Sequence, residues 1–214
     1  MNAAVIGATT GAVFGLIGVL VGQYLTQRRH SEALRHTAEL EEQRGNEAAL
    51  LKYFEVVGQL LTSPPSEADY LSPILRAQTL TLLEALEPGH KRILLQFLYE
   101  LSLLGPEKPG LSLQGANLRE ANLAGANLGE TSLERVHLER ANLAEANLVG
   151  ANLRRANLRE ANLKEADLSG AFLQEITKES LTQTQIDEAV GNDPTKLPDH
   201  LQRPPHWRRS RRKS

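Results

Sequence analysis

The chain has 214 residues, a net charge of −2, 41% hydrophobic residues and only 4% aromatic residues. This length allows one ordinary domain, or a small domain with attachments, whose core must be built from leucine and alanine. The absence of cysteine excludes disulfides, thiolate metal sites and cysteine nucleophiles, and the charge excludes a molecule that is strongly basic or acidic throughout.

An apolar segment opens the chain. Residues 3–22 carry no charge, and their 20 positions match the length needed to cross a bilayer as a helix. The N-terminus lacks the basic residues and the cleavage site of a secretory signal peptide, so we predict a retained transmembrane anchor over residues 1–25. The alternative is a buried helix of a soluble core. Arg28, Arg29 and Arg35 follow the segment, so the positive-inside rule predicts an outside N-terminus and a cytoplasmic bulk.

Five glycines of this segment fall on one side of the predicted helix, within an arc of about 80°. Glycines four residues apart let membrane helices approach closely, so the stripe predicts a seam through which two copies form a homodimer. The alternative is that glycine is simply common in membrane helices. The seam consists of Gly7, Gly11, Gly15, Gly18 and Gly22.

Helix-forming sequence follows the anchor. We predict a charged juxtamembrane helix over residues 26–45 and a small helical region over residues 46–110. Within that region, apolar residues at helical spacing predict helices over 50–62, 72–86 and 91–104, the second with Ser72 as its cap and Pro73 at its first position. The expected buried side of the third helix consists of Ile93, Leu94, Phe97, Leu98, Leu101 and Leu104.

Leucine then recurs every five residues, thirteen times from Leu113 to Leu173. In an α-helix successive leucines would rotate by about 140° around the axis, and in a flat strand they would alternate between faces. The spacing fits a chain that turns a corner in every repeat, with alanine and leucine inside, asparagine outside and the next two residues at the corner. Such coils stack with sheet-like pairing between them. Pairing of the outward charges disfavours three sides per coil and leaves four and five open.

The tandem Ala-Asn/Asp-Leu-x-x pattern resembles the pentapeptide-repeat family. Residues 97–118 and 181–207 also resemble sequences that flank the repeats in such proteins. The resemblance implies a right-handed, four-sided β-helix. We therefore predict a mainly β solenoid of about three coils over residues 111–175, preceded by the transmembrane helix and the small helical region. A C-terminal cap over residues 176–202 closes it with a short helix, where Thr182 and Gln185 are typical of a capping box.

Some repeat positions depart from the pattern. Leu111, Thr131 and Val136 stand where the pattern has an inward alanine, and His137 stands where it has an outward asparagine. Phe172 also replaces an outward residue, and we expect it to pack under Ile176 and the C-terminal helix. We expect the remaining outward asparagines to bond to the local backbone at the corners.

Known catalytic and phosphate-binding motifs are missing from the sequence, so we predict no enzyme activity, no catalytic residue, no cofactor and no metal. His137 with Glu134 and Glu139 comes nearest to a metal site. It is more simply explained as one outward position in a ladder of side chains.

Two basic regions are candidates for binding. One is a patch on the repeats, with an ordinary charged exterior as its alternative, and it consists of Arg135, Arg154, Arg155 and Arg159. The other is a tail over residues 203–214, predicted to be disordered and to contact an anionic membrane surface. Its alternatives are contact with nucleic acid and a tail that only aids solubility. Its contact residues are Trp207, Arg208, Arg209, Arg211, Arg212 and Lys213.

These features predict a non-enzymatic, membrane-anchored interaction scaffold on the cytoplasmic face. Its expected partners are membrane lipid and an unidentified protein, and nucleic acid is not expected. The resemblance supplies an alternative, because some pentapeptide-repeat proteins mimic DNA and bind topoisomerases such as gyrase. Residues 111–175 carry seven basic and nine acidic residues in alternation, which disfavours a DNA mimic.

Overall fold

The computed structural model describes residues 39–59, 65–104 and 110–207. The chain divides into two compact units, Met1–Ala48 and Ala49–Ser214, and the described part of the first unit is the helical stretch 39–48. The predicted anchor over residues 1–25, its glycine seam and most of the juxtamembrane helix lie outside the described residues. In the described ranges, no helix combines the length and the apolar character needed to span a membrane.

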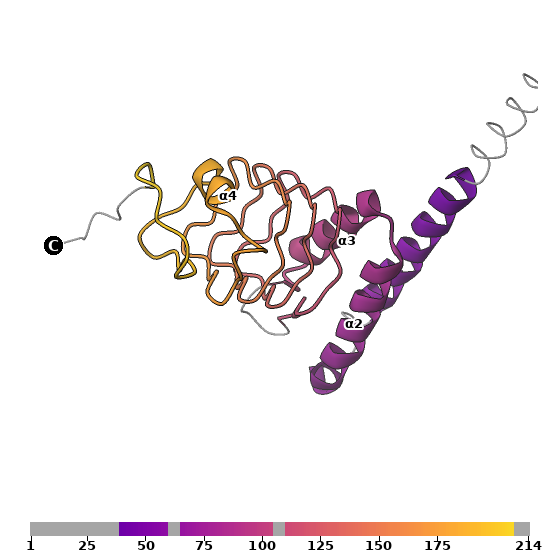
Figure 1. Ribbon diagram of the computed structural model, residues 1–214. Helices are drawn as coiled ribbons and strands as arrows, with labels where there is room; N and C mark the ends of the chain where they lie inside the picture. The colour runs from indigo at the N-terminus through magenta and orange to yellow at the C-terminus, as the bar shows by residue number, and fades with distance from the viewer. Residues whose placement is uncertain (1–38, 60–64, 105–109, 208–214) are drawn as a thin grey trace, which may run out of the picture. The chain divides into compact units, whose positions relative to one another are not determined.

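The repeats wind into stacked coils, which lie between α3 and α4 in Figure 1. Eight parallel backbone bridges join residues 20 apart, such as Asn117 with His137 and Asn122 with Asn142. Because one coil takes 20 residues and a corner occurs every five, each coil has four sides, and five sides are excluded. In the described part of the chain, each face pairs through a single residue per coil, and no extended strand forms.

Twelve of the thirteen corners are tight turns closed by one backbone hydrogen bond. The amide after the corner donates to the leucine carbonyl before it, as from Ala116 to Leu113 at 2.9 Å. The second corner residue has a positive φ at all thirteen corners, from 56° at Glu130 to 74° at Gly115. This combination is that of a type II turn, which favours glycine at the second position. Nine of the thirteen positions hold a residue other than glycine, each in the left-handed region at a cost of about 1–2 kcal/mol.

Leucine and alanine fill the interior of the solenoid, as predicted. All thirteen repeat leucines are 0% exposed, and Leu111, Thr131 and Val136 take the inward place of alanine in the same core. The prediction for Phe172 was wrong, because its side chain is 42% exposed whereas Ile176 is buried. Phe172 comes just before Leu173, and the residue in that place points outward in each repeat, so the ring is exposed although it is hydrophobic.

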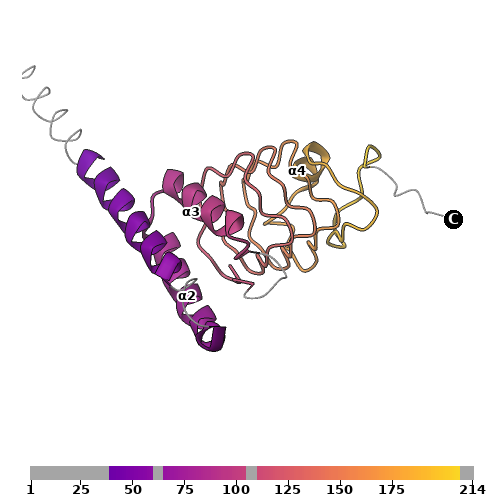
Figure 2. The same cartoon turned by 180° about the vertical axis from the view of Figure 1, so that it is seen from behind.

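Helices precede the coils, as both ribbon views show (Figures 1 and 2). They are a helix over residues 39–59, α2 (Pro65–Ala85) and α3 (Pro88–Glu100). The predicted start of the second helix at Ser72 was wrong, since α2 begins at Pro65 and contains Pro73. Proline at the first helical position loses no helical hydrogen bond, so both prolines were candidates for the start.

The buried side of α3 also differs from the prediction. Leu94, Leu95 and Leu98 are buried together with Lys91, whereas Ile93 is 50% exposed. The helix also ends at Glu100 instead of Leu104. These differences arise because α3 packs against the first coil, which presents backbone carbonyl oxygens as well as apolar side chains to the helix.

Side chains of α2 and α3 satisfy the open edge of the first coil. Lys91 Nζ donates to the Asn117 carbonyl at 3.0 Å, and Arg76 donates to the carbonyls of Ser112 at 3.1 Å and Gln114 at 2.8 Å. These carbonyls have no preceding coil to pair with, so the cations replace the missing backbone donors. Burial lowers the pKa of Lys91 below its ordinary value.

The last coil is closed by α4 (Gln183–Glu188), and the predicted capping box of Thr182 and Gln185 is present. The Gln185 side chain also donates to the carbonyls of Leu158 at 2.8 Å and Ala161 at 2.9 Å. After α4, the chain extends the two remaining faces, where Asp167 pairs with Val190 and Phe172 pairs with Lys196.

The predicted start of the disordered tail at residue 203 was wrong. Trp207 is only 4% exposed, and its Nε1 donates to the Ala189 carbonyl at 2.9 Å. Arg203 lies over the Trp207 ring and donates to the Thr195 carbonyl at 3.0 Å. The cap therefore extends to residue 207, and Trp207 belongs to its core and does not face a membrane surface. The remaining residues of the predicted tail, 208–214, lie outside the described residues.

Candidate interaction surface

Each coil has four faces, one per Ala-Asn-Leu step, separated by four corners. We call face 1 the face whose outward residues are Asn117, His137 and Asn157, and number the others in chain order. Corner 1, which follows face 1, holds residues 119–120, 139–140 and 159–160. Corner 4, on the other border of face 1, holds residues 114–115, 134–135, 154–155 and 174–175.

All arginines of the repeats lie at the two corners that border face 1. We call face 1 with corners 1 and 4 the arginine side. The arginines are Arg119, Arg140 and Arg159 at corner 1 and Arg135, Arg154 and Arg155 at corner 4. Corners 2 and 3, across the solenoid, carry Lys164 as their one basic residue and are otherwise acidic or uncharged, with Gly125, Gly129 and Gly150 among them. The cross-section of the solenoid is therefore polarised in charge.

Corner 1 is an ion-pair ladder that runs across the coils. Arg119 pairs with Glu139 at 2.9 Å, and Arg140 lies 2.8 Å from Glu160 and 3.7 Å from Glu120. The hydrogen bond from Arg140 holds the pKa of Glu160 below its ordinary value. Because most of these side chains are largely exposed, each pair contributes little stability, and its main effect is to fix where the charges stand.

Corner 4 contains most of the predicted basic patch. Arg154 and Arg155 both donate to Glu175, the latter from Nε at 2.7 Å. These two hydrogen bonds hold the pKa of Glu175 below its ordinary value. Half of the predicted patch is therefore engaged by one carboxylate, which offsets one of its two charges.

The other two predicted arginines keep looser partners. Arg135 lies 3.8 Å from Glu134, and Arg159 lies 3.6 Å from Glu160, each its neighbour in sequence. Their side chains are 56% and 59% exposed. The structure thus places the four predicted arginines on two corners around one face, and leaves Arg135 and Arg159 the most available for a partner.

Glu139 stands at corner 1, on the border of face 1. Its Oε1 accepts from Arg119 at 2.9 Å and from Asn157 at 2.7 Å, and His137 Nδ1 lies 3.7 Å away. Burial raises the pKa of Glu139, but hydrogen bonds from Arg119 and from the Glu139 backbone, together with the charge of Arg119, bring the pKa below its ordinary value. Glu139 Oε2 is buried without a partner among the described residues. Through its Oε1 contacts, the carboxylate links three successive coils.

His137, Glu134 and Glu139, which the sequence did not favour as a metal site, do not converge in the structure. Glu139 is bound to Arg119 and Asn157, and Glu134 lies beside Arg135 at corner 4. Over the described ranges, no three ligating side chains converge on a point where a metal ion would fit. The chemistry that the arginine side offers is charge and hydrogen bonding to a second surface.

Outward asparagines make the surface rigid, and their predicted bonds to the local backbone are present. The Asn142 side-chain oxygen accepts from the Ala144 amide at 3.2 Å, two residues on. Asparagines also bond across coils, as from Asn162 to Asn142 at 3.1 Å and from Asn142 to Asn122 at 3.4 Å. Asn142 is thereby tied to its own corner and to both neighbouring coils.

Comparison with known proteins identifies the repeats. Residues 110–140 and 137–174 match the family model for pentapeptide repeats, with eight copies. The search of the curated proteins finds no match. Among solved structures, HetL is a pentapeptide repeat protein involved in heterocyst differentiation regulation from the cyanobacterium Nostoc sp. strain PCC 7120. It is 32% identical, with 36% of this chain aligned to 33% of HetL and a TM-score of 0.28.

Two further structures of pentapeptide repeat proteins are similar. Rfr23 from the cyanobacterium Cyanothece 51142 is 34% identical over 42% of this chain and 67% of its own, with a TM-score of 0.21. The protein alr5209 from Nostoc PCC 7120 is 22% identical over 55% of this chain and 93% of its own, with a TM-score of 0.19. The family relation implies a right-handed β-helix for the stacked coils. Through residues 110–174, the chain belongs to the pentapeptide-repeat family.

Proposed function

We propose that this protein is a non-enzymatic interaction scaffold, anchored in a membrane by its N-terminal segment, with its solenoid in the cytoplasm. Pentapeptide-repeat proteins are generally non-enzymatic. The apolar residues 3–22 and the arginines that follow them support the anchor and its orientation. The basic residues after the cap would add contact with anionic lipid. They are Arg208, Arg209, Arg211, Arg212 and Lys213.

The observation that carries the proposal is the gathering of all six repeat arginines on one side of a rigid solenoid. Fixed charges in a defined pattern select a partner and its orientation, since like charges placed opposite one another are costly. Basic and acidic groups alternate along the solenoid axis at corner 1, whereas at corner 4 Arg135 and Arg155 are neighbours of the same sign. The partner that fits this side is a protein surface with the complementary arrangement of charge.

Arg135 and Arg159 are the residues on which we expect the partner to depend most. They border face 1 on opposite sides and, among the residues that the structure describes, pair only with carboxylates beside them in sequence. A partner carboxylate would therefore compete with weak, exposed pairs. Arg154 and Arg155 would first have to release Glu175. The gyrase-binding alternative has no comparable observation in its favour, because the repeats carry both signs of charge nearly equally.

Proximity labelling in the native membrane tests the anchor and the surface together. The full chain should label membrane neighbours and one or more specific proteins, and a chain that lacks residues 1–27 should lose the membrane neighbours. The double change Arg135→Ala and Arg159→Ala should remove the specific proteins, whereas Lys164→Ala, at corner 2, should not. If the double arginine variant and Lys164→Ala label the specific proteins equally, the proposed binding surface is contradicted. If the chain without residues 1–27 still labels the membrane neighbours, the proposed anchor is contradicted.

A further inference from the structure

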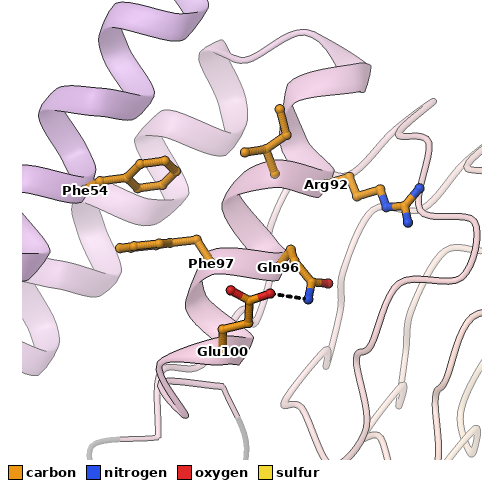
Figure 3. Close-up of a pocket in the computed structure, with 6 residues that line it drawn as sticks. Phe54, Arg92, Gln96, Phe97 and Glu100 are labelled. Carbon is orange, nitrogen blue, oxygen red and sulfur yellow. Dashed lines mark hydrogen bonds between the residues drawn. The ribbon is translucent and has the colours of Figure 1, made fainter.

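An open apolar groove lies in the helical layer that precedes the coils. Its volume is about 540 Å³, and its lining residues are Phe54, Arg92, Ile93, Gln96, Phe97 and Glu100. The rings of Phe54 and Phe97 face each other at 4.0 Å between centroids (Figure 3). Residue Leu51, one turn before Phe54, is 68% exposed. Water therefore contacts an apolar surface that a folded protein ordinarily covers.

The polar residues of the groove are spaced symmetrically along α3. Arg92, Gln96 and Glu100 follow one another at intervals of four residues, so they form one stripe about 12 Å long with Gln96 at its centre. Gln96 donates to Glu100 at 2.8 Å. Among the described residues, Arg92 has neither a hydrogen-bond nor an ion-pair partner. The stripe thus runs from an unpaired positive end to a negative end.

We propose that this groove binds a second copy of the chain, with the two α3 helices antiparallel about a twofold axis at Gln96. The antiparallel arrangement brings Arg92 of each copy to Glu100 of the other, because both lie four residues from the centre. The apolar residues beside the stripe, Ile93 and Phe97, cover the facing groove. A twofold interface has to be self-complementary, and this stripe meets that condition in charge and in spacing.

The extent of α3 sets the strength of this contact. The helix has 13 residues, or about 20 Å, so a contact built on it buries less than the roughly 800 Å² per partner of a standard stable interface. The dimer therefore dissociates on dilution and depends on a high local concentration of the chain. The contact is separate from the predicted glycine seam, and it does not depend on which partner the arginine side binds.

Disulfide trapping in the full-length chain tests the arrangement, because the native sequence contains no cysteine. Gln96→Cys, next to the axis, should give a disulfide-linked dimer under mild oxidation. Glu100→Cys should give several-fold less, since its two copies stand on opposite sides of the axis, and Glu145→Cys, exposed at corner 2, serves as a background control. Equal trapping at positions 96 and 100 would overturn the antiparallel register, and trapping at position 96 no higher than at position 145 would overturn the interface.

Charge exchange in the Gln96→Cys chain tests the pairing. Arg92→Glu and Glu100→Arg should each reduce the trapped dimer at least several-fold, because each places like charges opposite one another. The two changes together should restore it, which a merely unfolded variant would not do. If the charge changes leave the yield of trapped dimer unchanged, the proposal is overturned even though dimers form, since the glycine seam alone would then explain them. Trapping of a different protein in place of a second copy would overturn it as well.

Discussion

Replacing Glu145 with glycine should stabilise the solenoid, although it removes a side chain. Glu145 is the second residue of its corner and has a φ of 58°. A residue with a β-carbon pays about 1–2 kcal/mol for this conformation, and glycine avoids that cost. Glycine also loses about 0.5–1 kcal/mol more backbone entropy on folding. The net expectation is a gain of roughly 0.5–1 kcal/mol in the free energy of unfolding.

The reverse change isolates backbone strain from packing. Gly125 occupies the same place in its own corner with a φ of 65°, and a β-carbon there would meet no atom within 4 Å. Gly125→Val should therefore destabilise the solenoid by about 1 kcal/mol or more through strain alone, since β-branched residues tolerate this region poorly. Ala124→Val, at the preceding corner position with ordinary φ, is the matched control and should have little effect.

Thermal unfolding followed by circular dichroism measures these effects. For a chain of this size, 1 kcal/mol corresponds to a shift of about 2–4 °C in Tm. Glu145→Gly should raise Tm by about 1–4 °C, and Glu145→Gln separates the loss of charge from the relief of strain. The claim that the left-handed corner conformation carries a strain cost would be refuted if Glu145→Gly lowered Tm, or if Gly125→Val and Ala124→Val lowered Tm equally.

Three further changes test the core, the cap and the charge ladder. Leu143→Lys places a charge in the core and should cost several kcal/mol in urea unfolding, whereas the outward Asn142→Lys should cost much less, and equal losses would contradict the inward and outward assignment. Gly191→Ala brings a β-carbon to 2.5 Å from the Trp207 ring, so it should shift the emission of this single tryptophan to the red and lower Tm, and an unchanged spectrum would contradict the buried ring. Because the pKa of Glu139 is lowered in the folded chain, its carboxylate stabilises the fold above the unfolded pKa of about 4.3, and this stabilisation is lost as pH falls through the lower folded pKa. Glu139→Gln should therefore reduce the loss of stability at acid pH. An acid loss as steep as that of the native chain would contradict this role.

The period of the repeats made the architecture predictable. Leucine at every fifth residue excluded a helix and a flat strand, and the inward and outward positions followed from that spacing alone. The pairing of outward charges favoured a coil of four sides over one of three but did not distinguish four sides from five, because exposed ion pairs are weak and tolerate several registers. The gathering of arginines on one side became visible only once the 20-residue coil was established.

Predictions failed where neighbours from distant parts of the chain decide the outcome. The buried side of α3 is turned toward the first coil, where Lys91 meets the Asn117 carbonyl, and a helical pattern cannot anticipate that bond. Trp207 stands among prolines and basic residues, which are typical of a disordered tail, yet the cap encloses it against Gly191. The groove at Phe54 and Phe97 was missed because the helical spacing of both residues is typical of ordinary core positions.

Photo-crosslinking from the two sides of the solenoid tests the proposed surface most directly. A photoreactive amino acid at His137 lies on face 1 between the two arginine corners, and one at Asn142 lies on the neighbouring face 2, within the same coil. In the full-length chain in its native membrane, position 137 should yield a specific protein adduct that disappears with Arg135→Ala and Arg159→Ala, whereas position 142 should yield little. An adduct that forms equally from both positions, or from position 142 alone, would contradict a partner on the arginine side.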